Sequence, residues 1–556
     1  MKAIKWKVLG KLQNSKTPSN KKEEIVNILL ENRGIKKRQE REEFLNPIHP
    51  RDLTLEELKV DKTQVEKTIR RIKAAIVNKE KIIVYGDYDA DGVSGTAILW
   101  EALWGLKADV LPYIPERFSE GYGLNAESVK NLKSKYKNLK LIITVDNGIV
   151  ARDAVKKAKD IGINVIITDH HEKGEKYPED AFAVIHTKEI GGAGIAWILS
   201  REINKDFALG QLDLAAMGTI ADQLPLIGPN RSFAKYGILA LRETKRPGLR
   251  EIYNLASIDP KSIDTYHVNF MIAPRINAMG RLAHAIESLR LLCTKSPTKA
   301  LELSTLLEKT NRDRQNLVEE TVVHAKEKAL KTNEKIIILH SDNYHEGIIG
   351  LAASRLVEEF YRPSIVLSIK GDIAKASARS VSGFNIIKAI RLVNEYLIDG
   401  GGHEMAAGFS IETKNIEIFA KQLIRKSRTL LTESLLQKRL KIDVELELSD
   451  VSFDLIDKIK QLEPFGIGNP APVFMTSNVQ VTDARLVGRE GKHLKIKVVK
   501  GNIALDAIAF GRGDMYSQLG KGSEIDIAYS IEENEWNGTK SIQLKVRDIR
   551  FLKRDK

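Results

Sequence analysis

Lys81-Ile-Ile-Val-Tyr-Gly-Asp-Tyr-Asp-Ala-Asp-Gly92 is a short apolar run that breaks into acidic residues and glycine. The run has the length of a buried strand, and the acidic residues after it begin a polar loop. The same design recurs at Leu141-Ile-Ile-Thr-Val-Asp-Asn-Gly148 and at Asn164-Val-Ile-Ile-Thr-Asp-His-His171. Because helical stretches separate the three runs, they predict βαβ units and an α/β fold with a parallel sheet.

The acidic residues after these strands are candidate metal ligands. Parallel strands end at one edge of a sheet, and ligands of open α/β sheets bind beyond that edge. Collecting many carboxylates there without cations would be costly, because like charges repel. Oxygen ligands with an imidazole suit two Mn²⁺ or Mg²⁺ ions, which can clamp a phosphate and activate a water. The candidates are Asp87, Asp89, Asp146, Asp169, His170, His171 and Asp222.

One aspartate after a strand would more often cap a turn or a helix. A histidine pair alone is likewise more often structural. Three strands that each end in acidic residues are hard to explain in that way, and together they favour a metal site.

Composition narrows the class of protein. The formal net charge of +14 favours a polyanionic partner such as a nucleic acid, although a general lysine bias explains it almost as well. Cys293 is the single cysteine, which excludes an intrachain disulfide and disfavours a cysteine-based zinc site. The chain shows neither the apolar core of a signal peptide nor a membrane-length apolar run. We therefore expect a cytoplasmic protein without membrane contact.

A length of 556 residues suggests two to four domains. Residues 298–332 contain no glycine or proline and predict a long connecting helix. Short strand-like runs at close spacing after residue 478 predict a small β-barrel that resembles an oligonucleotide-binding (OB) fold. The expected segments are a basic helical region at 1–75, a catalytic domain at 76–296, the connecting helix at 297–332, a second α/β domain at 333–440 and the barrel at 441–556.

The motifs, in their order along the chain, resemble the DHH phosphoesterase superfamily. Four of them are similar to its defining motifs: Gly86-Asp-Tyr-Asp-Ala-Asp-Gly92, Val145-Asp-Asn-Gly148, Asp169-His-His171 and Ala221-Asp222. Others resemble its RecJ branch of single-strand-specific exonucleases. These are Arg117-Phe118, Gly121-Tyr-Gly-Leu-Asn125, Gly192-Ala-Gly194, Pro274-Arg-Ile-Asn-Ala-Met-Gly-Arg281, Asn311-Arg-Asp-Arg-Gln315, His345-Glu-Gly-Ile-Ile-Gly350, Ala376-Ser-Ala-Arg-Ser380, Gly401-Gly-His-Glu-Met-Ala-Ala-Gly408 and Pro464-Phe-Gly-Ile-Gly-Asn-Pro470. The resemblance implies a parallel-sheet DHH catalytic domain, a DHH-associated substrate-binding domain after the connecting helix, and a C-terminal OB-like barrel that binds nucleic acid.

The resemblance also implies roles for individual residues. Asp146 would bridge two metal ions; Asp89, His170 and Asp222 would complete one site, and Asp87 would belong to the other. His171 would lie near the scissile phosphate or behind the ligands, and Asp169 would orient a histidine ring. Glycines let a backbone approach an anion, so Gly401-Gly402-His403 is by itself a candidate phosphate-binding turn. The expected substrate-binding residues are Arg117, Arg275, Asn277, Arg281, Arg355, Ser377, Arg379, Gly401, Gly402 and His403.

The function implied is a 5′→3′ exonuclease that hydrolyses single-stranded DNA to mononucleotides in DNA repair and recombination. A helicase and a single-strand-binding protein would be its partners. Two alternatives stay open. One is a related phosphodiesterase that acts on short RNA or cyclic dinucleotides, and the other is an inactive nucleic-acid-binding scaffold.

Overall fold

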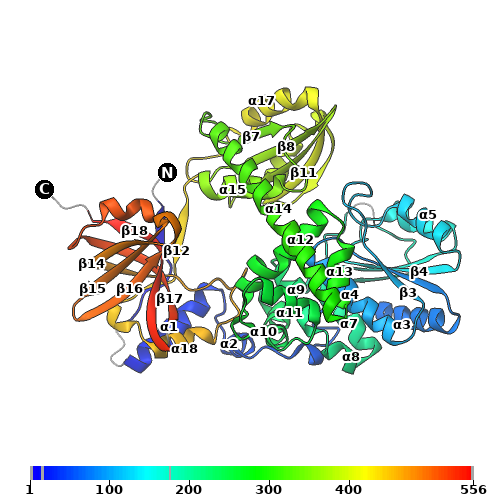
Figure 1. Ribbon diagram of the computed structural model, residues 1–556, viewed down its shortest axis with the longest axis horizontal. Helices are drawn as coiled ribbons and strands as arrows, with labels where there is room; N and C mark the ends of the chain where they lie inside the picture. The colour runs from blue at the N-terminus through cyan, green and yellow to red at the C-terminus, as the bar shows by residue number, and fades with distance from the viewer. Residues whose placement is uncertain (1–3, 14–17, 175–176, 537, 553–556) are drawn as a thin grey trace. The chain divides into compact units, whose positions relative to one another are not determined.

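The computed structural model describes residues 4–13, 18–174, 177–536 and 538–552. They form two compact units, coloured by residue number in Figure 1. The first unit contains residues 53–222 and 236–438, and the second contains residues 4–52, 223–235 and those from 439 onward. In the parts of the chain that the structure describes, no helix is long and apolar enough to cross a membrane.

The first unit begins with the predicted parallel sheet, whose strand order is β3-β2-β4-β5-β6. The strands are buried over most of their length because helices cover both faces. Helices α5 and α6 pack on one face, and α3, α4 and α7 on the other. The strands are β2 (Lys81–Tyr85), β3 (Val110–Tyr113), β4 (Leu139–Val145), β5 (Asn164–Asp169) and β6 (Ala183–His186).

Further helices surround α4, which is buried over nearly its whole length, since α7, α9 and α13 pack against it. The helices of this region are α3 (Lys62–Val77), α4 (Ala90–Gly105), α5 (Ala126–Lys135), α6 (Arg152–Asp160), α7 (Gly192–Ile203), α8 (Lys205–Leu209), α9 (Leu212–Ala221), α10 (Gly228–Arg242), α11 (Pro247–Leu255), α12 (Ala273–Leu282) and α13 (Ile286–Cys293).

The long helix α14 (Pro297–Ala329) leads from this region to the second sheet of the unit. It begins where expected, because Ser296 Oγ accepts a hydrogen bond from Lys299 N at 3.3 Å and Pro297 occupies the first turn. At about 1.5 Å per residue its 33 residues extend about 50 Å.

The second sheet has the order β10-β11-β9-β8-β7, in which only β7 and β8 are parallel. The predicted second α/β domain is therefore present with a mixed sheet. Its last helix, α17, ends at Ser427, before the expected domain boundary at residue 440. The elements are β7 (Ile337–Ser341), α15 (Ile349–Phe360), β8 (Ser364–Lys370), β9 (Ile373–Arg379), α16 (Ile386–Arg391), β10 (Leu397–Gly402), β11 (Ala406–Glu412) and α17 (Ile416–Ser427).

The second unit contains the predicted barrel, with strand order β13-β14-β15-β16-β18-β17, closed by pairing of β14 with β17. Its core comes from alternate strand residues such as Val479, Ile496 and Ile527. The elements are β12 (Arg439–Ile442), β13 (Val444–Glu445), α18 (Phe453–Lys460), β14 (Phe474–Val487), β15 (His493–Lys500), β16 (Ile503–Ala509), β17 (Glu524–Trp536) and β18 (Thr539–Phe551).

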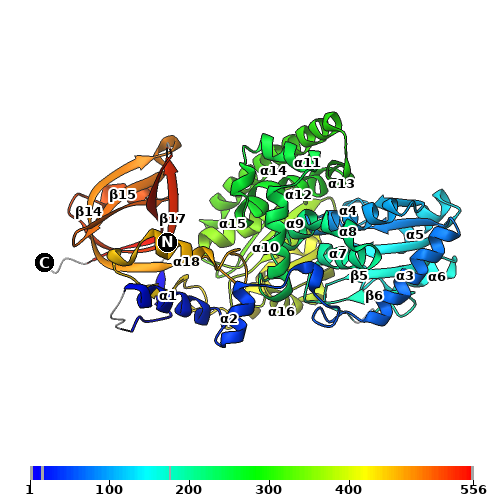
Figure 2. The same cartoon turned by 90° about the horizontal axis from the view of Figure 1, so that it is seen from below.

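The N-terminal residues belong to this second unit. Strand β1 (Lys5–Val8) pairs in parallel with β12, and α1 (Pro18–Asn32) lies beside α18 (Figure 2). Helix α2 (Arg38–Leu45) follows, and its Phe44 joins the barrel core. The expected segment 1–75 is thus divided in the structure, since α3 packs on the parallel sheet instead.

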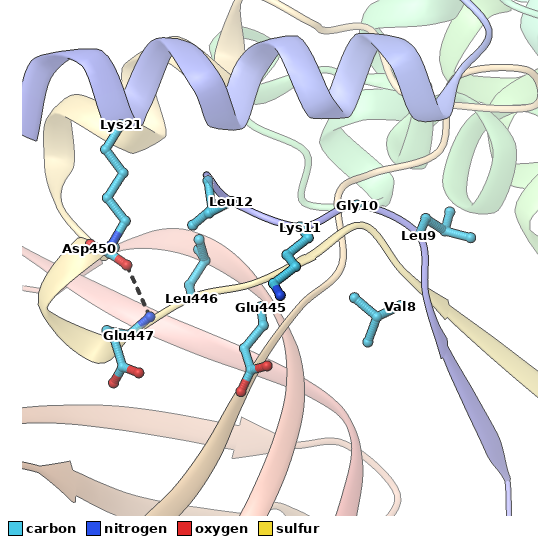
Figure 3. A pocket seen from close by; sticks show the side chains of 10 residues that line it. All are labelled: Val8, Leu9, Gly10, Lys11, Leu12, Lys21, Glu445, Leu446, Glu447 and Asp450. Carbon is cyan, nitrogen blue, oxygen red and sulfur yellow. Dashed lines mark hydrogen bonds and ion pairs between the residues drawn. The ribbon is translucent and has the colours of Figure 1, made fainter. Parts of the chain in front are cut away.

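A pocket of about 540 Å³ lies between the chain after β1, helix α1 and the barrel (Figure 3). Lys21 and Asp450 form an ion pair across it at 2.7 Å. Glu447 pairs with Lys500 at 2.7 Å. Asp450 and Glu447 are therefore each paired with a lysine of the same unit.

Candidate metal centre

The loop after β2 places two carboxylates at the carboxyl edge of the sheet. Asp89 caps α4, and its Oδ1 accepts hydrogen bonds from the backbone N–H groups of Asp91 and Gly92, both at 3.0 Å. A Cβ at Gly92 would lie 2.6 Å from Asp87 Cβ, so only glycine lets the helix start so close to this aspartate. Asp87 and Asp89 are thereby fixed by the first turn of α4.

Asp146 follows β4 and adopts a left-handed conformation with φ of 63°. Such a conformation is uncommon for a residue other than glycine and is often found at functional sites. Its N–H donates to Thr168 O on the neighbouring strand at 3.0 Å. A Cβ at Gly192, the first residue of α7, would lie 2.4 Å from Asp146 Cβ. The start of α7 therefore presses directly against this carboxylate.

Asp169 at the end of β5 orients His171. One carboxylate oxygen of Asp169 lies 2.8 Å from His171 Nδ1 and also accepts from His171 N at 3.0 Å. The other accepts from Ile149 N at 2.9 Å. The remaining ring nitrogen, His171 Nε2, lies 3.4 Å from the Tyr122 hydroxyl. His186 Nε2 lies 2.7 Å from the backbone oxygen of His171 and supports the same segment.

The ligand atoms converge. His170 Nε2 lies 3.0 Å from Asp146 Oδ1 and 3.6 Å from Asp222 Oδ2, although Asp222 is at the end of α9. Three groups of residues each bring one ligand atom apiece to within 4.8 Å of one another: Asp87, Asp89 and Asp146; Asp146, His170 and His171; and Asp91, His170 and Asp222. The structure thus brings together all seven residues that the sequence predicted, because Asp169 holds His171.

Three of the converging atoms have no hydrogen-bond partner among the described residues. They are Asp87 Oδ1, Asp146 Oδ1 and His170 Nε2, all buried. A buried polar atom left unpaired costs about 1–3 kcal/mol. Divalent cations at this position would pair all three, so the residues present fit a two-metal centre.

The electrostatics agree with this fit. Burial, followed by the charge of nearby carboxylates, raises the pKa of Asp87 and Asp146 well above the ordinary range. The same causes raise the pKa of Asp222 to about 8. Burial, with the charge of His171, lowers the pKa of His170 to about 4 and leaves that ring neutral, as a metal ligand must be.

His171 behaves differently from His170. Burial acts to lower its pKa, but the hydrogen bond and the negative charge of Asp169 outweigh burial and raise the pKa to about 9. This ring is therefore a cation at neutral pH in the absence of metal. Its Nδ1 faces Asp169 and Asp146, at 2.8 and 3.9 Å, and its Nε2 faces the Tyr122 hydroxyl.

Asp91 is a further acidic residue of the centre that was not among the predicted candidates. Asp91 is buried, and its two carboxylate oxygens accept from Gly192 N at 2.7 Å and Ala193 N at 2.9 Å. A Cβ at Gly218 would lie 2.3 Å from Asp91 Oδ1. Asp91 therefore joins α4, α7 and α9 behind the centre, and the available signal was its place as the third acid of the first motif.

Three predicted substrate-binding arginines gather beside the centre. Arg117 lies over the Tyr88 ring, with its guanidinium carbon 5.0 Å from the ring centroid. Arg281 Nη1 donates to Gly347 O at 3.2 Å. Burial, followed by the charges of Arg117 and other arginines, lowers the pKa of Arg281 to about 10. Among the described residues, neither arginine pairs with a carboxylate.

The third arginine, Arg379 on β9, donates from Nη1 to Ser377 Oγ at 3.1 Å. It too has no carboxylate partner within the described ranges. Burial, followed by the charge of Arg117, lowers the pKa of Arg379. Clustered guanidinium groups without acids are typical of an anion site.

The other predicted substrate-binding residues have different surroundings. Asn277 Oδ1 accepts from Ala90 N at 2.7 Å and so supports the start of α4. Arg275 and Arg355 form ion pairs with Glu308 at 2.6 Å and with Glu358 at 3.2 Å. Gly401, Gly402 and His403 are exposed at the end of β10.

Three family models match the chain. The model described as "DHH family, N-terminal domain" matches residues 81–219, the "DHHA1 domain" matches residues 333–428, and the "RecJ OB domain" matches residues 442–548. These matches cover the parallel sheet, the second sheet and the barrel.

Two relatives from different bacteria carry the same name. The single-stranded-DNA-specific exonuclease RecJ of Bacillus subtilis is 36% identical over 493 residues, which are 86% of this chain and 62% of that protein, so the chain spans less than two thirds of that relative's length. RecJ of Salmonella typhimurium is 32% identical over 508 residues, which are 84% of this chain and 87% of that protein.

Solved structures of a RecJ protein are also similar to this chain. RecJ from Thermus thermophilus in complex with Mn²⁺ has a TM-score of 0.81 at 29% identity and covers 99% of this chain and 80% of that one. The same protein in complex with Mg²⁺ has a TM-score of 0.77. The resemblance expected from the motifs is confirmed, and this chain belongs to the RecJ family of single-stranded-DNA-specific exonucleases.

Proposed function

We propose that this chain is a 5′→3′ exonuclease that hydrolyses single-stranded DNA to mononucleotides with two Mn²⁺ or Mg²⁺ ions. The observation that carries the proposal is the convergence of Asp87, Asp146 and His170, whose buried polar atoms lack partners within the described residues. Asp87, Asp89 and Asp146 would hold one ion. Asp146 would share the second ion with His170 and Asp222. Asp89 is assigned to the first ion because its oxygen lies with those of Asp87 and Asp146.

Bound divalent ions supply positive charge that stabilises both the attacking and the leaving oxygen of an in-line displacement at phosphorus. The chain's own residues then position the strand and move protons. His171 would contact the scissile phosphate through Nε2, since Asp169 fixes its ring through Nδ1. Because Asp169 occupies Nδ1, a protonated ring would carry its second proton at Nε2 and could donate it to the leaving oxygen.

The arginine cluster would hold a phosphate of the strand next to the one being hydrolysed. Arg117, Arg281 and Arg379 offer guanidinium groups that no carboxylate of the described residues neutralises. A strand that is gripped by its terminal phosphate would enter in one direction; the 5′→3′ polarity is proposed from the family resemblance.

In the cell, such an enzyme would degrade strands during DNA repair and recombination. A helicase would supply single strands from duplex DNA, and a single-strand-binding protein would keep them open. The family names and the +14 charge of the chain support a nucleic-acid substrate.

The test is digestion of single-stranded DNA labelled at its 5′ end, with Mn²⁺, with Mg²⁺ or with EDTA. We expect labelled mononucleotide to be the first product, and EDTA to abolish its release. Asp146→Ala should remove hydrolysis while leaving the circular dichroism spectrum and the melting temperature near those of the wild type. Asp206→Ala, which removes an exposed carboxylate on α8, is the matched control. Full activity of purified Asp146→Ala would overturn the metal assignment.

The same assay separates the alternatives. Short RNA and a cyclic dinucleotide are offered in parallel with DNA, and a clear preference for either would favour the related phosphodiesterase. Binding of single-stranded DNA without hydrolysis in the presence of Mn²⁺ would favour the scaffold.

A further inference from the structure

A continuous helical segment extends from the metal centre to an exposed aromatic pair. The π-helical residues His267–Ile272 run without a break into α12. Tyr266 and Phe270 are 58% and 67% exposed, and their ring centroids lie 5.0 Å apart with the planes inclined at 33°. Two large aromatic rings held together in solvent are unusual, and π-helical turns are frequent at functional sites.

This pair lies on the same continuous helical segment as residues of the site. Val268, Ile272 and Ile276 are buried in the core, whereas Tyr266 and Phe270 are exposed. Asn277 and Arg281 follow in α12, after the π-helical turn, and are partly buried.

The α12 end of this helical segment lies at the metal centre. Asn277 Oδ1 accepts from Ala90 N, next to Asp89, and Arg281 belongs to the arginine cluster. At about 1.5 Å per residue, the eleven steps from Phe270 to Arg281 cover roughly 16 Å.

Positive charge lies between the two ends. Glu308 on α14 accepts from Arg275 Nε at 2.6 Å and from Arg312 Nε at 3.0 Å, so one carboxylate faces two guanidinium groups. Arg314 donates to the Asn311 side-chain oxygen at 2.9 Å and, among the described residues, has no acidic partner. Burial, followed by the charges of Arg355 and Arg275, lowers the pKa of Arg314, which places these groups close together.

We propose that Tyr266 and Phe270 form a stacking platform for bases of the single strand that extends away from the centre, while Arg275 and Arg314 contact its phosphates. Stacking on aromatic rings tolerates any base but needs an unpaired base face, which duplex DNA does not offer. The platform therefore selects single strands at a distance from the hydrolysed bond. The proposal rests on the proposed exonuclease function and specifies how that site holds its substrate.

Comparing a short substrate with a long one distinguishes base stacking on Tyr266 and Phe270 from a general structural role of these two rings. The segment from Phe270 to Arg281 covers roughly 16 Å, which is longer than an extended dinucleotide, so a dinucleotide does not reach the platform. We compare kcat and KM for a dinucleotide and for a strand of about twenty nucleotides. The variants are the double substitution Tyr266→Ala with Phe270→Ala, the conservative Tyr266→Phe, and Trp104→Ala. Trp104 is a matched control because it is 64% exposed, stacks on Trp100 and lies at the end of α4 remote from the centre.

For the double variant we expect KM for the long strand to rise about tenfold or more, with kcat unchanged and the dinucleotide unaffected. Tyr266→Phe keeps a stacking ring and should behave like Trp104→Ala. An unchanged KM for the long strand, or an equal loss on both substrates, would overturn the platform. Under the first of these results, a protein partner becomes the better explanation of the exposed rings.

Fluorescence anisotropy with the labelled long strand keeps the two proposals apart. If the wild type hydrolyses nothing, the proposed function fails. Tenfold weaker binding by the double variant would still support the platform, and equal binding would refute it.

Discussion

Gly192 is the position at which one added methyl group tests the geometry of the metal centre. An alanine Cβ there would lie 2.4 Å from Asp146 Cβ and 2.6 Å from both Asp146 Cγ and Oδ1. Carbon atoms in contact prefer about 3.5–4.0 Å, so the carboxylate or the start of α7 must move by about 1 Å. The same residue donates its N–H to Asp91 at 2.7 Å, and this hydrogen bond would move with it.

The size of the effect follows from that displacement. Overpacking a close contact costs about 1–3 kcal/mol of folding free energy. A shift of about 1 Å in a reacting group can cost about 100-fold in rate. We therefore expect Gly192→Ala to lower kcat by about 100-fold and to weaken Mn²⁺ binding, although every proposed ligand is retained.

Gly105→Ala is the matched control. Gly105 ends α4, and the nearest atom to its added Cβ would be Phe207 Cε2 at 3.8 Å. In a helix this change should stabilise the protein by up to about 1 kcal/mol. The assays are Mn²⁺-dependent release of 5′ label, Mn²⁺ titration calorimetry and urea unfolding. Wild-type Mn²⁺ affinity and activity in Gly192→Ala would refute the close packing of α7 on Asp146.

Three further predictions concern charge. Glu101 accepts two hydrogen bonds from Arg246 at 2.8 Å, which outweigh the effect of burial and hold the pKa of Glu101 below its ordinary 4.5. This stabilisation is present above pH 4.5 and is lost as pH falls through the pKa of Glu101 in the folded protein. The melting temperature of Glu101→Gln should therefore lie below that of the wild type at neutral pH, and the difference should shrink in acid. A difference that stays the same at low pH would contradict this. Arg379→Lys keeps the charge but loses the planar fork, and we expect about tenfold higher KM for 5′-phosphorylated strands, which steady-state kinetics would contradict by an unchanged KM. Because the pKa of Asp222 is raised to about 8, Mn²⁺ should displace protons and bind more tightly as pH rises toward 8; calorimetric enthalpies that do not depend on the buffer would rule this out.

The parallel sheet was predictable because each of its central strands is a continuous apolar run that ends in acidic residues. A strand buried on both faces needs no alternation, so its length and its polar end are sufficient signals. Convergence of Asp87, Asp146 and His170 then follows from one rule about where parallel strands end.

The N-terminal region was not predictable in the same way. Strand β1 has four residues, two of them lysine, and its partner β12 lies more than 400 positions later in the chain. Pairing over that separation leaves no local pattern, because the strand gains its order only from the partner. The strongly charged helix α1 likewise shows its buried residues only against the barrel.

The role of Asp91 was hidden for a related reason. An acidic residue in the first turn of a helix is common, because it interacts favourably with the helix dipole. Its position in the sequence therefore gives no sign of a further role. Its real partners are the N–H groups of Gly192 and Ala193, about a hundred residues away. Asn277 is the opposite case. It was expected to bind substrate, and in the structure its side-chain oxygen accepts a hydrogen bond from the first residue of α4.

Five acidic residues of the centre divide into two kinds by what their oxygens contact, while the sixth, Asp222, lies at the end of α9 with its Oδ2 3.6 Å from His170 Nε2. Asp89, Asp91 and Asp169 accept backbone N–H groups, which fix the starts of α4 and α7 and the His171 segment. Asp87 and Asp146 each keep a buried oxygen without a partner among the described residues. A centre built in this way holds its unpaired atoms at fixed positions before any cation arrives, because backbone N–H groups already fix the acids around them. Its activity should consequently depend as strongly on Asp91 and Asp169, which fix this frame, as on Asp87 and Asp146.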